Sequence, residues 1–324
     1  MKEFELIKRF FTEQAIKRKD VLLGIGDDCA IVSPSERHNI AITTDTLVAG
    51  VHFPHETSAR AIGHKSIAVN LSDLAAMGAE PSWVSLAITM PEVDLKWVEE
   101  FCVGAFALCE YYNVQLIGGD TTQGPLAITV TAQGQVPKER HLTRSGAKAG
   151  DWLYVTGEIG DAALALKDVF KEVKLESEYR DDVRQRLDFP APRILAGQAL
   201  REYASAAIDL SDGLISDLGH ICDASKVGAN IVLDDLPISN ALRDTLGMEK
   251  AYGLALVGGD DYELLFSVCE NNKVGMETAL ANSGITVTCV GQLNNRSGKI
   301  TTTLDSKPVP IVAKSFEHFS NSKY

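Results

Sequence analysis

The spacing of apolar residues along the chain changes repeatedly between the period of a helix and that of a strand. Apolar positions three or four residues apart predict helices, and short runs rich in β-branched residues predict strands. Asp94 is a good N-cap for one helix, and Gly78 is a typical C-terminal stop for another. In the first half, the pattern predicts helices at 3–17, 59–77 and 94–112, and strands at 40–48, 84–90, 114–117 and 127–136, the last two of them buried.

A glycine-rich turn at 145–151 marks a change of character, and 324 residues are long for a single core. We therefore expect two domains, spanning residues 1–148 and 149–324. The second half again mixes both periods. It is predicted to hold strands at 152–156, 206–210, 262–268 and 286–291, a helix after Ser211, and a charged, solvent-exposed helical segment at 171–186.

The composition, 45% hydrophobic and 23% charged, is typical of a globular protein. No apolar run approaches the roughly 18 residues of a membrane span, and the N-terminus lacks the apolar stretch of a signal peptide. We therefore expect a cytoplasmic protein that does not bind membranes. The net charge of −13 argues against a nucleic-acid partner. The cysteines form no C-x-x-C pair, so we expect reduced core thiols at Cys29, Cys102, Cys109, Cys222, Cys269 and Cys289.

Carboxylates recur in small or glycine-rich turns where predicted strands end. A single turn of this kind has an ordinary explanation, because Asp and Gly are common in turns and Asp caps helices. Recurrence favours another interpretation, since carboxylates gathered at one edge of a sheet repel each other unless a cation lies among them, and Mg²⁺ prefers such oxygen ligands. The residues concerned are Asp27, Asp28, Asp45, Asp120, Asp209, Asp212, Asp260 and Asp261.

Asp73 is the most informative single residue, because it lies inside the otherwise apolar helix predicted at 59–77. Asn70, three residues earlier, extends a polar stripe along the same helix face. A lone buried carboxylate is costly, so Asp73 either pairs with a cation such as Lys65 or binds a metal ion. We favour the metal.

The common nucleotide-binding motifs are absent from the sequence. It has no G-x-x-x-x-G-K-[ST] loop, no G-x-G-x-x-G and no H-R-D or D-F-G pair, and 157–160 does not complete a dinucleotide fingerprint. Any phosphate group would therefore be bound by metal ions, Arg144 and backbone amides.

Seven segments in this order resemble the thiamine-monophosphate kinase family, over nearly the whole chain. That family is related to aminoimidazole ribonucleotide synthetase and selenophosphate synthetase. The segments are 24–30, 44–53, 70–78, 117–122, 144–147, 208–213 and 258–263, read as GIGDDCA, TDTLVAGVHF, NLSDLAAMG, IGGDTT, RSGA, IDLSDG and GGDDYE.

The resemblance implies a two-domain aminoimidazole ribonucleotide synthetase-like fold of α/β and α+β class. An N-terminal α/β domain would pair its sheet with that of a second subunit in a homodimer, and a C-terminal α+β domain would close the cleft that holds ATP and several Mg²⁺ ions. The implied reaction is direct in-line transfer from ATP to thiamine monophosphate, giving ADP and thiamine diphosphate.

The resemblance also implies roles for individual residues. The metal ligands would be Asp28, Thr44, Asp45, Asp73, Asp120, Asp209 and Asp212, with Asp28, Asp73, Asp120 and Asp212 as the catalytic set. The nucleotide contacts would be Tyr112, Gly119, Asp120, Arg144 and Ser211, and the substrate contacts would be His52, Asp260 and Phe316. The family usually has Glu where this chain has Asp260, so the carboxylate is kept with a shorter reach.

Other classes of protein fit the sequence less well. Selenophosphate synthetase would carry a reactive Cys or selenocysteine in a glycine-rich N-terminal loop, whereas Cys29 follows the aspartate pair; aminoimidazole ribonucleotide synthetase is a second, weaker alternative. A structural Ca²⁺-binding protein would show D-x-[DN]-x-[DN]-G loops, which are missing. A metal-dependent phosphohydrolase would bring paired histidines, and only His52 and His55 lie close together.

Overall fold

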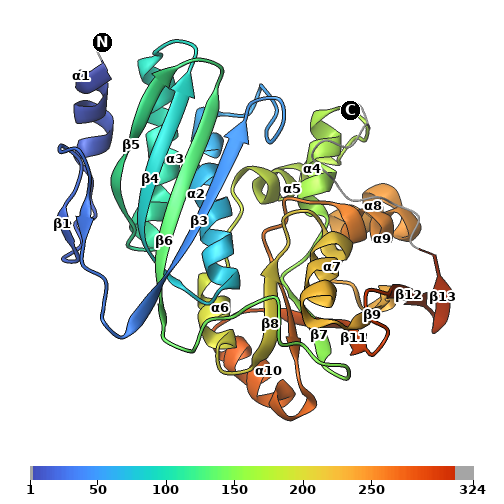
Figure 1. Ribbon diagram of the computed structural model, residues 1–324. Coiled ribbons are helices and arrows are strands. Elements are labelled where there is room, and N and C mark those ends of the chain that lie inside the picture. Colours follow the sequence, from blue (N-terminus) through green and yellow to red (C-terminus); the bar gives the residue numbers. More distant parts are fainter. Residues whose placement is uncertain (1–2, 311–324) are drawn as a thin grey trace. The chain divides into compact units, whose positions relative to one another are not determined.

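The computed structural model describes residues 3–310, which form two compact units (Figure 1). Unit 1 consists of residues 3–74, 79–141 and 188–194, and unit 2 of residues 75–78, 142–187 and 195–310. The chain thus passes between the units more than once. A domain boundary after residue 148 stays a prediction.

Unit 1 is built on a four-stranded sheet with the strand order β3-β6-β4-β5. β4 and β5 run parallel and are joined by a crossover helix, α3, while the other two pairs are antiparallel. The prediction of four strands here is confirmed, although β5 continues well past residue 117. The elements are β3 (His38–Val48), β4 (Glu80–Met90), α3 (Leu95–Tyr111), β5 (Gln115–Gln123) and β6 (Ala127–Pro137).

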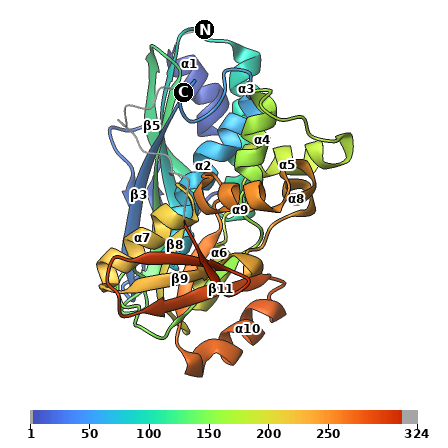
Figure 2. The same cartoon turned by 90° about the vertical axis from the view of Figure 1, so that its right-hand side faces the viewer.

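Helix α2 (Ala59–Ala76) packs with α3 on one face of this sheet, which Figure 2 shows nearly edge on. Two glycines let the helix backbones touch, because an added Cβ would lie 2.0 Å from the Phe101 carbonyl at Gly63 and 1.9 Å from the Arg60 carbonyl at Gly104. The predicted burial of 114–117 and 127–136 is confirmed for alternate residues, such as Val114 and Leu116. Side chains of β6 alternate between buried and half-buried, and most of β5 beyond its first residues is not buried.

The first helix is much shorter than predicted. α1 (Glu3–Ile7) passes into one turn of π-helix, η1 (Lys8–Thr12), and helix ends there rather than at Lys17. The Gln14 side chain then donates to the Leu116 carbonyl at 2.7 Å and accepts from the Leu116 N–H at 2.8 Å. The Gln14 amide thereby bonds the backbone groups of Leu116 on β5, the edge strand of the sheet. This tertiary contact overrides the helical spacing of apolar residues up to Lys17. A two-stranded hairpin follows, β1 (Val21–Leu23) with β2 (Ile31–Val32).

Unit 2 contains a seven-stranded sheet with the order β13-β12-β9-β11-β7-β10-β8. Every pair is antiparallel except β9 with β12. The strands are β7 (Trp152–Thr156), β8 (Ala204–Asp209), β9 (Gly228–Val232), β10 (Leu264–Val268), β11 (Val287–Asn294), β12 (Ile300–Leu304) and β13 (Lys307–Val309).

Helices cover both faces of this sheet because its strands are apolar on both sides. Leu153 and Val155 of β7 belong to the main apolar core with helices α4, α7, α8 and α9. On the other face Tyr154 stacks on Phe266 at 5.7 Å and donates a hydrogen bond to Glu277 of α10. The helices are α4 (Asp161–Val169), α5 (Ser177–Asp188), α6 (Ile194–Leu200), α7 (Leu214–Ser225), α8 (Asn240–Leu246), α9 (Met248–Val257) and α10 (Lys273–Asn282).

Two predictions about the whole chain can be compared with these elements. Every helix within residues 3–310 is too short or too polar to cross a bilayer. Of the six cysteines, Cys102, Cys109 and Cys222 are buried thiols, whereas Cys29 is exposed in the loop between β1 and β2. The prediction of a core position is therefore wrong for Cys29.

Candidate active site

In unit 1, strand β3 and helix α2 bring Asp45 and Asp73 together. Thr43 and Asp45 lie two residues apart on β3 and so share the face that α2 covers. The Thr43 hydroxyl donates a hydrogen bond to the Asp73 carboxylate. Burial, the charge of Asp73 and a hydrogen bond with it raise the pKa of Asp45 to about 6. The Asp45 carboxyl therefore keeps its proton to a higher pH than an ordinary aspartate does.

This pair fits a divalent cation. Two carboxylates in contact can both ionise at neutral pH only if positive charge lies beside them. One turn earlier on α2, Asn70 is fully buried, and its Oδ1 lacks a hydrogen-bond partner among the described residues. No three His, Cys, Asp or Glu side chains within residues 3–310 are grouped to hold a metal. An ion at Asp45 and Asp73 would therefore take its other ligands from water and phosphate oxygens, as Mg²⁺ commonly does.

Thr44 and Asp120 point to the opposite face of the same sheet. The Thr44 hydroxyl lies 2.9 Å from that of Thr131 on this face. Asp120 lies in register with Ala87, and Ala87 with Thr129, so Asp120 shares the face of these threonines. The Thr122 hydroxyl donates to the Asp120 carboxylate at 2.7 Å. Side chains on the two faces of one sheet cannot bind the same ion directly. Asp45 and Asp120 also lie inside their strands rather than at the ends.

Gly119 precedes Asp120 on β5, and Tyr112 lies at the end of α3. A Cβ on Gly119 would lie 1.8 Å from the Leu86 carbonyl, so only glycine fits where β5 approaches β4. Tyr112, at the end of α3, donates its hydroxyl to the Pro192 carbonyl at 2.9 Å. Burial and neighbouring Tyr111 raise the pKa of Tyr112 to about 12, so the phenol is a neutral donor.

Two further predicted residues of unit 1 lie in loops. Asp28 is exposed between β1 and β2, where its N–H donates to the Asp27 carboxylate at 2.9 Å. His52 is half-buried just after β3, and its Nδ1 accepts the Val48 N–H at 3.0 Å. That bond leaves the Nε2 of His52 as the donor of the neutral ring.

In unit 2, Asp209 and Asp212 bracket the turn between β8 and α7. Asp209 is the last residue of β8 and is 4% exposed. Asp217, in the first turn of α7, accepts the Asp212 N–H at 3.2 Å. Burial and the charge of Asp212 raise the pKa of Asp217 to about 7, although backbone N–H groups of this turn oppose the shift. The sequence reasoning missed Asp217, whose only signal was an acidic residue in the first helical turn.

The segment around Asp260 is joined to this same turn. The Asp260 N–H donates to the Ser211 carbonyl at 2.9 Å, and the Tyr262 N–H donates to the Leu210 carbonyl at 2.8 Å. Asp260 and Tyr262 have φ angles of +70° and +51°. A left-handed conformation costs a non-glycine residue about 1–2 kcal/mol, and such strain is common at functional sites.

Two acidic residues near Asp260 accept hydrogen bonds from other parts of unit 2. Both oxygens of Asp261 accept the Gly160 N–H, at 2.9 and 3.0 Å, and Glu263 accepts the Thr156 hydroxyl at 2.6 Å. Burial raises the pKa of Asp261 well above its usual value. The turn at 157–160, which resembled an incomplete dinucleotide motif, is thus the anchor of Asp261.

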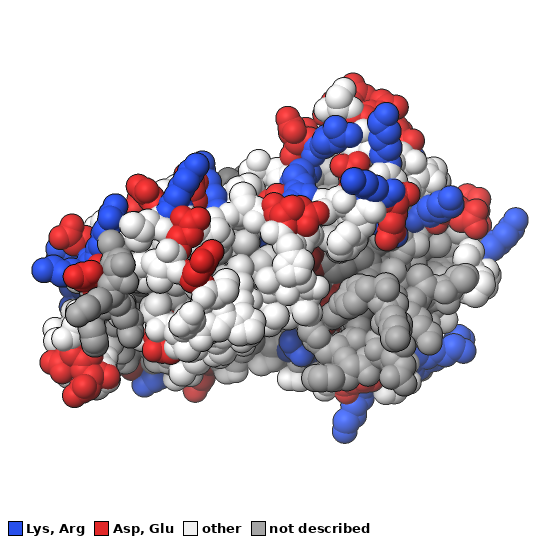
Figure 3. Space-filling view, turned by 90° about the horizontal axis from the view of Figure 1, so that it is seen from above, with Lys and Arg blue, Asp and Glu red and all other residues white. Residues whose placement is uncertain are grey.

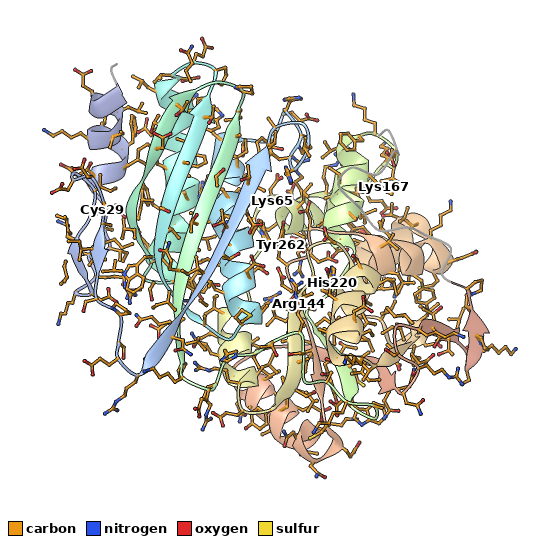
Figure 4. The ribbon with its side chains drawn as sticks, in the orientation of Figure 1. Cys29, Lys65, Arg144, Lys167, His220 and Tyr262 are labelled. Carbon is orange, nitrogen blue, oxygen red and sulfur yellow. The ribbon has the colours of Figure 1, made fainter. Side chains whose placement is uncertain are left out.

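Arg144, labelled in Figure 4, is exposed in a segment of unit 2 that bonds to β8. The Thr143 carbonyl accepts the Ala207 N–H at 2.9 Å, and the Arg144 carbonyl accepts the Ser225 hydroxyl at 3.0 Å. These bonds fix the backbone and leave the guanidinium exposed. The remaining predicted contact, Phe316, lies outside the described residues.

Charges are mixed rather than segregated on the face shown in Figure 3, where Lys and Arg side chains alternate with Asp and Glu. The charged side chains visible on the described part of this face therefore form no single acidic surface.

Comparison with known proteins gives concordant matches. Family models of AIR synthase related proteins match residues 26–136 (N-terminal domain) and 148–302 (C-terminal domain). The thiamine-monophosphate kinase of Escherichia coli (strain K12) is 49% identical over 319 residues, which cover 98% of each chain.

Solved structures of thiamine-monophosphate kinases also match this chain. The thiamine-monophosphate kinase from Stenotrophomonas maltophilia K279a is 44% identical with a TM-score of 0.84, over 90% of this chain and 93% of that one. AaThiL complexed with AMPPCP and TMP is 32% identical with a TM-score of 0.76, over 91% and 92%. The predicted two-domain fold class is confirmed by these matches.

Proposed function

Because the chain belongs to the thiamine-monophosphate kinase family, we propose that it transfers the γ-phosphoryl group of ATP to thiamine monophosphate, giving ADP and thiamine diphosphate. The observation that carries this proposal is the 49% identity to a thiamine-monophosphate kinase over nearly the whole of both chains. The solved relative with AMPPCP and TMP supports the same pair of substrates.

We propose that Asp45 and Asp73 hold Mg²⁺ in unit 1, because two carboxyl groups in contact favour a positive charge beside them. Asp28, Thr44 and Asp120 of unit 1, and Asp209 and Asp212 of unit 2, complete the proposed ligand set. Thr44 and Asp120 would serve a different ion from Asp45 and Asp73, since they face the other side of the sheet. Bound Mg²⁺ would neutralise phosphate oxygens and stabilise the charge of in-line transfer.

The remaining residues bind and orient the substrates. We assign the nucleotide to Tyr112, Gly119, Arg144 and Ser211, with Arg144 as a cation for its phosphates. We assign thiamine monophosphate to His52, Asp260 and Phe316. The acceptor phosphate is already ionised near neutral pH, so the reaction needs neither a strong general base nor a protein nucleophile.

We also propose a homodimer formed through the face of the four-stranded sheet opposite α2 and α3. Ile42 is 67% exposed on this face, among the paired threonines Thr44–Thr131 and Thr46–Thr129. A second copy of the chain would bury this apolar residue, as the family resemblance implies. Ile42→Lys should convert a dimer to a monomer in analytical ultracentrifugation. A wild type that sediments as a monomer at micromolar concentration would refute this part.

The test of the reaction is a direct assay. The purified protein is mixed with ATP, Mg²⁺ and thiamine monophosphate, and ADP and thiamine diphosphate are separated by chromatography. The expected result is equal amounts of both products, with none from free thiamine and none when EDTA replaces Mg²⁺. ATP binding without thiamine diphosphate would keep the fold family and reject the acceptor.

A further inference from the structure

Residues 260–262 are held by more contacts than an ordinary loop needs. The N–H groups of Asp260 and Tyr262 donate to carbonyls of the turn after β8, and both oxygens of Asp261 accept the N–H of Gly160. The Tyr262 hydroxyl then reaches back to donate to Oδ1 of Asp260 at 3.0 Å. Tyr262, which precedes β10 and is labelled in Figure 4, is only 8% exposed.

The backbone of this segment is strained on both sides of Asp261. Asp tolerates the left-handed region comparatively well, but a Tyr there is an outlier that the surrounding structure must enforce. This strained backbone brings the Tyr262 hydroxyl back to the carboxylate of Asp260, two residues earlier. In a regular strand, residues i and i+2 would project side by side without the hydroxyl folding back onto the earlier carboxylate.

We propose that Tyr262 is a positioning residue that fixes the direction of the Asp260 carboxylate and thereby sets the affinity for the thiamine moiety of the substrate. This inference rests on the proposed function, because it takes Asp260 as a contact to thiamine monophosphate. A hydrogen bond from a buried phenol to a carboxylate limits the rotation of that carboxylate and occupies one of its lone pairs. The remaining acceptor positions then point in a defined direction.

The short side chain of Asp260 strengthens the case. Where the resemblance implies a Glu with an additional rotatable bond, this chain has an Asp whose carboxylate stays close to the backbone. A tyrosine two residues away can reach it directly. The Asp260 carboxylate reaches less far than that of a Glu, but it is held more rigidly. This rigidity lowers the entropy lost when a ligand binds.

The test compares Tyr262→Phe with wild type in steady-state kinetics for both substrates. Loss of a hydrogen bond to a charged group should raise KM for thiamine monophosphate about tenfold. The value of kcat and KM for ATP should each stay within about twofold, because neither depends on the orientation of Asp260. Direct titration of thiamine monophosphate by calorimetry, without ATP, should give the same tenfold loss.

Two further variants separate positioning from folding. Tyr154→Phe is the matched control, because Tyr154 is also a buried tyrosine of unit 2 whose hydroxyl donates to a carboxylate, that of Glu277. It should lower the thermal midpoint without changing KM. Asp260→Gly removes the carboxylate while allowing the left-handed backbone. In that background Tyr262→Phe should change KM by less than about twofold, because residues acting through one contact are not additive.

The outcomes distinguish the two proposals. A wild type that neither turns over nor binds thiamine monophosphate overturns the proposed function and this inference with it. An active wild type with an unchanged KM in Tyr262→Phe overturns this inference alone. The same holds if Tyr262→Phe and Asp260→Gly multiply their effects, or if Tyr154→Phe raises KM equally.

Discussion

Carboxyl groups with a raised pKa have different surroundings in the two units. Asp45 of unit 1 and Asp217 of unit 2 both have a raised pKa, about 6 and about 7, and burial is the main cause for both. The neighbours of the two groups differ. Asp45 shares a hydrogen bond with the carboxylate of Asp73, whereas Asp217 feels the charge of Asp212 but accepts a backbone N–H in front of α7. A raised pKa alone therefore does not identify a ligand-binding group, and the partners of the carboxyl group must be considered as well.

Rigidity has a different source in each unit. The pair in unit 1 projects from a strand and a helix, whose backbones are fixed by their own hydrogen bonds. The turn between β8 and α7 in unit 2 is irregular, and Asp217 of α7 accepts a backbone N–H of that turn. We infer that the Asp217 carboxylate is partly committed to structure, because it accepts a backbone N–H of the turn that precedes its helix.

The largest effect should follow from Asp73→Asn. This change keeps the shape and removes one charge of the pair, so turnover should fall by about 10³-fold while the thermal midpoint stays unchanged or rises. The measurements are kcat at saturating Mg²⁺ and thermal unfolding. Asp94→Asn, which exchanges one good helix N-cap for another, is the control with unchanged turnover. Wild-type activity of Asp73→Asn at limiting Mg²⁺ would remove Asp73 from the site.

The second effect concerns pH and metal together. Because the pKa of Asp45 is raised from 3.8 to about 6 in the folded chain, the native state binds more protons than the unfolded state between these values. Without metal, the free energy of unfolding should therefore fall as pH rises from about 4 to 6. Mg²⁺ favours the ionised pair, so its apparent affinity should fall about tenfold per pH unit below pH 6.

Thermal unfolding at a series of Mg²⁺ concentrations, repeated from pH 5 to pH 8, measures this linkage. Asp45→Asn should remove the pH dependence of the Mg²⁺ effect. Equal Mg²⁺ affinity at pH 5 and pH 7 in the wild type would show that the pair does not bind the ion.

A third, smaller effect should follow from Asp217→Ala in unit 2. Removing a carboxylate that holds backbone N–H groups should lower the free energy of unfolding by about 3 kcal/mol and reduce turnover, since the turn carrying Asp212 loosens. Mg²⁺ affinity at Asp45 should not change. Asp223→Ala, an exposed position on the same helix, is the control. A lost Mg²⁺ response in Asp217→Ala, with stability intact, would make Asp217 a ligand.

Some of this structure follows from the sequence. Strand 152–156 was predicted with its observed bounds, because a buried apolar run lies between Gly150-Asp151 and Gly157. The opposite directions of Thr44 and Asp45 follow from strand alternation alone. The early end of the first helix could not be predicted, because it depends on the pairing of Gln14 with Leu116 across the fold. The left-handed conformation of Tyr262 is equally invisible, since no local preference favours it.

The smallest effect should follow from Asp260→Glu, which restores the residue usual in the family. Two consequences oppose each other. The longer side chain regains reach toward the substrate, but Glu tolerates the left-handed backbone less well than Asp and adds a rotatable bond that the Tyr262 hydroxyl must restrain. KM for thiamine monophosphate should therefore change by no more than about threefold, with kcat unchanged. A tenfold fall in KM would mean that the reach of this side chain, and not its orientation, limits the binding of thiamine monophosphate.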